Sequence, residues 1–70
     1  MEININGKRS QVERSGRGYV MIRARGHGPI CIEMDEKLKF QLENDSHAWN
    51  AEMDRLEQRV IEQARRVWKD

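Results

Sequence analysis

The sequence predicts an α+β domain in which an antiparallel meander of three or four strands packs against one long C-terminal amphipathic helix. Residues 1–43, which we read mainly as β-hairpins, contain all five glycines and the one proline, so turns punctuate short alternating segments. Residues 46–68 contain neither residue type and repeat apolar side chains at helical spacing. With 70 residues, the whole chain 1–70 is predicted to be a single small domain.

The chain begins with a predicted β-hairpin. Residues 1–5 alternate apolar and polar, and Asn6-Gly7 is the dipeptide that best tolerates the positive φ angles of a two-residue hairpin turn. The return segment, residues 8–13, has Val12 as its only bulky apolar side chain and begins with two cations. These features are typical of an edge strand. A flexible basic loop is expected at residues 14–18.

A second hairpin is predicted after this loop. Residues 19–24 alternate, which places Val20 and Ile22 on the inner face. Matching the apolar faces of the two strands puts Ile22 opposite Ile32 and leaves residues 25–29 as the loop. The outer face then carries Tyr19, Met21, Arg23, Cys31 and Glu33.

Residues 37–43 fit two structures. Leu38, Phe40 and Leu42 alternate as they would in a strand. Leu38 and Leu42 are also four residues apart, behind Asp35 as a possible N-cap, as they would be in a helix. We favour the strand slightly and leave the helix open.

Residues 46–68 are predicted to form the long helix. Asn44-Asp45-Ser46 supplies N-cap residues, and no helix-breaking residue follows. At 100° per residue, one set of apolar side chains falls within about 60° of Trp49. We call this set the helix seam: Trp49, Met53, Leu56, Val60, Ala64 and Val67.

The length of this helix predicts a homodimer. At 1.5 Å per residue it spans about 35 Å, whereas a compact domain of this size is about 28 Å across. About one turn should therefore extend past the sheet and carry Trp68, which forms a second apolar strip with Ile61. A second copy of the chain would cover that strip. The expected protein interface consists of Ile61, Arg65, Arg66 and Trp68.

The charge distribution and the hydropathy of the chain indicate which classes of protein are excluded. The formal net charge is +1, but residues 1–28 carry +4 and residues 29–70 carry −3. No apolar run approaches the roughly 20 residues of a membrane span, and the N-terminus lacks a signal-peptide core. We therefore expect a cytoplasmic protein without a membrane partner.

The function that we expect first is a non-enzymatic protein-interaction domain, an adaptor, inhibitor or regulatory accessory protein that acts as a homodimer on another protein. The alternative is a small nucleic-acid-binding regulator, since arginines can contact phosphates and an aromatic ring can stack on an unpaired base. The candidate contacts for this alternative are Arg14, Arg17, Tyr19, Arg23 and Arg25.

Catalytic and metal-binding signals are weak. Cys31, His27, His47 and Asp35 show no spacing of a recurrent metal site. A cysteine–histidine nucleophile would also need an orienting residue and an oxyanion hole, which no motif specifies. A domain this small has little volume for a substrate pocket. We therefore expect no catalytic residue, cofactor, metal or small-molecule substrate.

Overall fold

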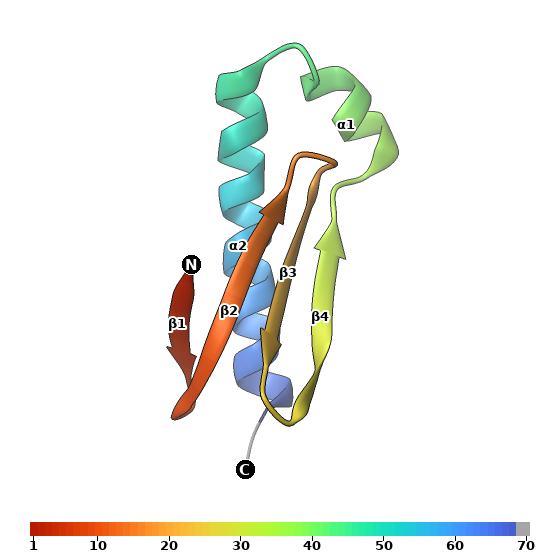
Figure 1. Cartoon of the computed structure of the whole chain (residues 1–70). Helices are drawn as coiled ribbons and strands as arrows, with labels where there is room; N and C mark the ends of the chain where they lie inside the picture. The colour runs from red at the N-terminus through yellow and green to blue at the C-terminus, as the bar shows by residue number, and fades with distance from the viewer. Residues whose placement is uncertain (69–70) are drawn as a thin grey trace.

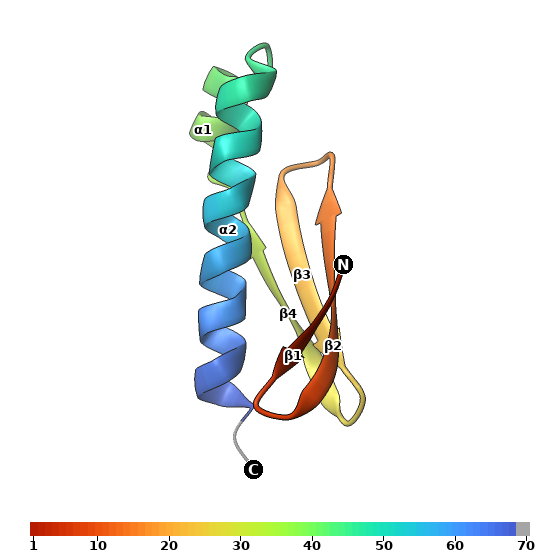
Figure 2. The same cartoon turned by 90° about the vertical axis from the view of Figure 1, so that its left-hand side faces the viewer.

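The computed structural model describes residues 1–68 and has two layers, an antiparallel sheet and helices on one of its faces (Figures 1 and 2). The predicted α+β class is confirmed. The strands lie in chain order across the sheet: β1 (Glu2–Ile5), β2 (Lys8–Ser15), β3 (Tyr19–Ala24) and β4 (His27–Glu33). The helices are α1 (Glu36–Leu42) and α2 (Ser46–Val67).

The first hairpin forms at the predicted turn, but its return strand is not an edge. Asn6 and Gly7 have φ angles of +51° and +87°, as both central residues of a type I′ turn require. β2 lies between β1 and β3, so the expected edge position is wrong, and β1 and β4 are the edges. The inward side chains of β2 include Ser10 and Val12, both buried. The Ser10 hydroxyl donates to the carbonyl oxygen of Lys8 at 3.2 Å, so this polar side chain is satisfied inside the domain.

The second hairpin has a tighter turn than expected. Ile22 pairs with Ile30 and not with Ile32 as expected, and Ala24 pairs with His27. Only Arg25 and Gly26 then lie between the paired residues, and Gly26 has a φ of +85°. From Tyr19 to Ile22 the register differs from the expected one by two residues, which keeps these side chains on their predicted face, so matching apolar faces could not determine it. Between Ile22 and Ala24 an irregularity shifts the pairing by one further residue.

Residues 36–42 form a helix, so the favoured strand is wrong. Asp35 caps α1 by accepting a hydrogen bond from the backbone N–H of Lys37 at 3.1 Å. Leu38 and Leu42 are partly buried against the core, whereas Phe40 is 77% exposed. The four-residue spacing of the two leucines therefore outweighs the alternation, because it places both on the side of α1 that meets the core.

The core lies between α2 and the inner face of the sheet. α2 begins where predicted, and Asp45 caps it by accepting from the N–H of Ala48 at 3.1 Å. Most of the helix seam is buried, but Val67 is 61% exposed, so its assignment to the seam is wrong. The buried apolar residues are Ile5, Val12, Val20, Ile22, Met34, Met53, Leu56, Val60, Ile61, Ala64 and Trp68.

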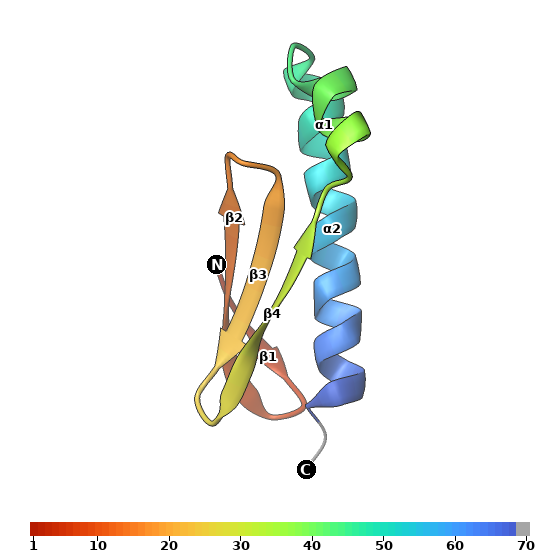
Figure 3. The same cartoon turned by 90° about the vertical axis from the view of Figure 1, so that its right-hand side faces the viewer.

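The expected exposure of Ile61 and Trp68 is also wrong, since they are 8% and 2% exposed. The Trp68 ring stacks on His27 with 5.1 Å between the ring centroids. The Asn6 amide donates to the backbone carbonyls of Arg65 at 2.9 Å and of Trp68 at 3.4 Å. These contacts hold the C-terminal end of α2 against the turns of the sheet, and α2 extends past the sheet at its other end, beside α1 (Figure 3). α2 therefore overhangs the sheet, as its length predicts, but at its N-terminal end and not at the end that carries Trp68.

Gly18 gives a first test of this fold. It has a φ of +93°, and a Cβ there would lie 3.1 Å from Lys39 Cε and 3.2 Å from Trp49 Cη2. We expect Gly18→Ala to lower the free energy of unfolding by about 1–3 kcal/mol, because alanine disfavours this backbone conformation and would crowd both side chains. Gly16→Ala, with open space and no positive φ, should change it by less than about 0.5 kcal/mol.

Urea unfolding of the two variants measures this difference. Equal losses in both would mean that the loop as a whole, rather than the close packing at Gly18, limits stability.

Candidate nucleic-acid interface

The outer face of the sheet is not covered by either helix (Figures 2 and 3). Cross-strand pairing places Tyr19 opposite Glu33 and Met21 opposite Cys31. Since these side chains alternate with the buried Val20, they lie on the outer face, as predicted. This face is therefore open to a ligand.

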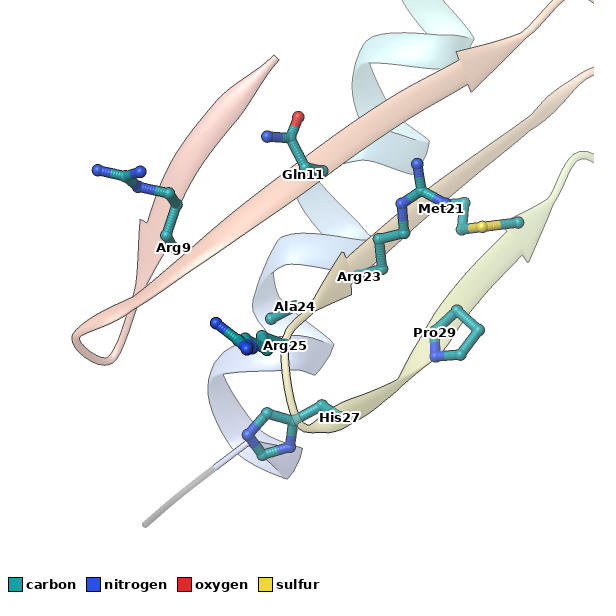
Figure 4. A pocket seen from close by; sticks show the side chains of 8 residues that line it. All are labelled: Arg9, Gln11, Met21, Arg23, Ala24, Arg25, His27 and Pro29. Atoms are coloured by element: carbon teal, nitrogen blue, oxygen red, sulfur yellow. The ribbon is translucent and has the colours of Figure 1, made fainter.

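A shallow hollow of about 550 Å³ lies on this face, near the turn between β3 and β4 (Figure 4). Three arginines line it from three parts of the sheet: Arg9 near the start of β2, Arg23 in β3 and Arg25 in the turn. No lining residue is acidic. The complete lining is Arg9, Gln11, Met21, Arg23, Ala24, Arg25, His27 and Pro29.

The carboxylates that pair with these arginines stand outside the hollow. Arg9 Nε lies 3.2 Å from Glu2 Oε1, and an Arg23 terminal nitrogen lies 2.6 Å from Glu13 Oε1. Within residues 1–68, Arg25 has no ion pair. Exposed pairs of this kind contribute about 0–1 kcal/mol. An incoming anion can therefore replace the two carboxylates at little cost.

Apolar side chains lie beside the arginines. Met21 and Pro29 line the hollow, and Tyr19 lies two residues before Met21 on the same face of β3. Tyr19 is half-buried, so part of its ring is accessible. Together these three side chains form what we call the apolar strip, on which a planar or apolar group can rest.

Arg14 lies away from this face. Its guanidinium contacts Asp54 at 2.6 Å and Glu57 at 3.0 Å, both on α2. Hydrogen bonding to Glu57, and then to Asp54, raises the pKa of Arg14 above its ordinary value. Arg14 thus ties β2 to α2, and its charge is already neutralised by this pair of carboxylates.

Arg17 lies in the loop between β2 and β3. This loop is at the opposite end of β3 from the hollow lined by Arg9, Arg23 and Arg25, which we call the arginine hollow. Arg17 lines a second hollow, of about 390 Å³, together with Phe40 and Trp49. Of the five predicted nucleic-acid contacts, the structure therefore brings Arg23 and Arg25 together, with Tyr19 on the same face.

Arg9 was missed as a contact by the sequence reasoning. The pairing of Gln11 with Arg23 brings the beginning of β2 alongside the end of β3. Arg9 is two residues before Gln11 and so shares its face of the sheet. Only the register between β2 and β3 could have revealed Arg9 as a contact, and the sequence pattern did not determine that register.

The predicted protein interface is not a continuous surface. Ile61 and Trp68 belong to the core, whereas Arg65 and Arg66 are exposed on the last turn of α2. Ile61 and Trp68 therefore expose little surface to a partner.

No metal centre is evident in the part of the chain that the structure describes, because no three His, Cys, Asp or Glu side chains converge there. The Cys31 thiol is free and exposed. Neither described helix has the length and apolar character of a membrane span.

The arrangement suits the binding of an anion. Arginine guanidinium groups match phosphate oxygens geometrically and keep their charge at all ordinary pH values. Comparison of the chain with protein-family models, with curated proteins and with solved structures finds no match.

Proposed function

We propose that this chain is a small, non-enzymatic, cytoplasmic domain that binds single-stranded nucleic acid through the outer face of its sheet. The observation that carries the proposal is the hollow lined by Arg9, Arg23 and Arg25 without any carboxylate. Glu2 and Glu13 pair with two of these arginines, so the five side chains together carry a net charge of +1, and Arg25 is the arginine of the hollow without an ion pair among residues 1–68. Phosphate groups are the ligands that clustered arginines favour.

The spread of the arginines favours a polymer over a single anion. They come from β2, β3 and the turn that follows β3, and so line the hollow at separate places (Figure 4). Successive phosphates of one strand could each meet a different guanidinium group. A lone phosphate could meet only some of the three guanidinium groups, because they come from different parts of the sheet.

The apolar strip favours a single strand over a duplex. Unpaired bases can rest on aromatic and apolar side chains, and each stacked base contributes about 1–3 kcal/mol. In a duplex the bases are already stacked, so Tyr19, Met21 and Pro29 would gain nothing from them. Three phosphate contacts predict a slope of about −2 for the logarithm of affinity against the logarithm of salt concentration.

The direct test is fluorescence anisotropy with a labelled single-stranded oligonucleotide of mixed sequence, the matching duplex and polyglutamate of equal charge. We expect the single strand to bind most tightly, with the salt slope given above. Equal binding of polyglutamate would instead indicate an acidic protein as the partner. No binding of the single strand at low salt would refute the proposal.

A second candidate is the homodimeric protein-interaction domain expected from the sequence, which remains a proposal. The observation that favours it is an exposed aromatic residue, Phe40 on α1. Ile61 and Trp68 are buried, so we place such an interface at the end of the molecule that carries α1, where Phe40 is exposed.

A further inference from the structure

The exposed side of α1 centres on Phe40, the only phenylalanine of the chain. Leu38 and Leu42 pack against the core. Residues two positions away on a helix point about 200° away, so Phe40 faces outward and is 77% exposed. This side chain therefore contributes little to the core that holds the domain together.

Two opposite charges flank Phe40. Lys37 lies three residues before it and Glu43 three residues after it, and both are exposed. Positions three apart on a helix are neighbours on its surface. Neither side chain has an ion pair or hydrogen bond among residues 1–68, in contrast to Lys39, which contacts Glu33 at 2.9 Å.

We propose that a second copy of this chain binds at α1, with Phe40 of each copy on a twofold axis. The axis of such a dimer lies in the plane of contact. An axis perpendicular to the line from Lys37 to Glu43 exchanges these two positions. Each Lys37 then meets Glu43 of the partner subunit, and the two Phe40 rings pack together in the centre.

Charge complementarity favours a second copy over a different protein. Lys37 and Glu43 lie on opposite sides of the apolar Phe40, so this pair of positions is complementary to itself. Arg17, Glu36 and Lys39 also lie near Phe40. A uniformly acidic or basic partner would leave Glu43 or Lys37 against a like charge, which is unfavourable.

The contact is small, so we expect a transient dimer with a dissociation constant of about 0.1–1 mM. It does not rest on nucleic-acid binding. The arginine hollow lies at the β3–β4 turn and α1 lies at the opposite end of a molecule that is 41 Å long (Figure 1). A dimer would carry two such hollows far apart, which would raise its apparent affinity for a long strand.

Sedimentation equilibrium from about 10 µM to 1 mM tests the dimer in the absence of nucleic acid, across the expected dissociation constant. We expect the wild type to self-associate and Phe40→Asp to remain monomeric with an unchanged circular dichroism spectrum. Val67→Asp, an equal change at another exposed apolar residue, should associate like the wild type. A monomeric wild type, or a dimer that survives Phe40→Asp, would overturn the proposal.

Charge reversal tests the twofold arrangement itself. Lys37→Glu and Glu43→Lys should each weaken association at least about fivefold, because each places like charges together. The double variant Lys37→Glu/Glu43→Lys should restore it, since the two charges are simply exchanged. Absence of this rescue would overturn the pairing of Lys37 with Glu43 of the partner subunit, whatever the outcome for nucleic acid.

Discussion

Replacing Trp68 by alanine is expected to lower the free energy of unfolding by about 3–5 kcal/mol, the usual cost of truncating a buried aromatic side chain. Trp68 is 2% exposed and its ring stacks on His27. It closes the end of the core where α2 meets the turns of the sheet. A domain of 70 residues has a total stability of only about 4–10 kcal/mol, so the variant should be largely unfolded near 37 °C.

Val67→Ala is the matched control, because Val67 precedes Trp68 and is 61% exposed. This change should alter the free energy of unfolding by less than about 0.5 kcal/mol. Urea unfolding followed by circular dichroism compares the two variants without relying on tryptophan fluorescence.

Comparison of Trp68→Ala with Val67→Ala also shows whether Trp68 belongs to the core or to a protein interface. If Trp68 lay in a protein interface, Trp68→Ala would leave the unfolding of the monomer unchanged and alter only its sedimentation. Similar small losses in both variants would therefore contradict the burial of Trp68.

The error over Trp68 shows where helical periodicity stops being informative. Continued at 100° per residue, the pattern places Val67 on the helix seam and Trp68 about 100° away from it. The helix ends at Val67, however, and Trp68 has φ −90° and ψ +54°, outside helical geometry. Its side-chain direction is set by this bend and by the contact with His27. The period placed Met53, Leu56, Val60 and Ala64 correctly on the buried side of α2. Ile61 also lies inside the helix and is buried, so the buried side is wider than the helix seam.

The candidate site was only partly predictable for a related reason. Alternation placed Tyr19 and Arg23 on the outer face, and that placement needed only local sequence. The grouping of Arg9 with Arg23 depends on the register between β2 and β3. Arg14 lies outside the site because its guanidinium group contacts Asp54, which is 40 residues away in the chain. Neither long-range relation is encoded in a local pattern, so five candidate contacts could be proposed but not sorted.

The double variant Arg23→Ala/Arg25→Ala is expected to weaken single-strand binding at least about tenfold, because charge-assisted hydrogen bonds contribute about 1.5–3 kcal/mol each. Its salt slope should fall from about −2 to about −0.7, since one of three phosphate contacts remains. Both side chains are exposed and the Arg23 pair with Glu13 is solvated. The variant should therefore remain folded.

Arg55→Ala/Arg59→Ala controls for net charge, since it removes the same two charges from an exposed face of α2. Anisotropy titrations over a series of salt concentrations give both the affinity and the slope. If binding depends on the arginine hollow, this control keeps the wild-type slope. If the two double variants lose affinity and slope equally, the attraction comes from overall charge, and the assignment of the site to Arg23 and Arg25 is wrong. The two double variants have the same net charge. They should therefore differ in salt slope if the arginine hollow binds the strand, and share one slope if only the net charge matters.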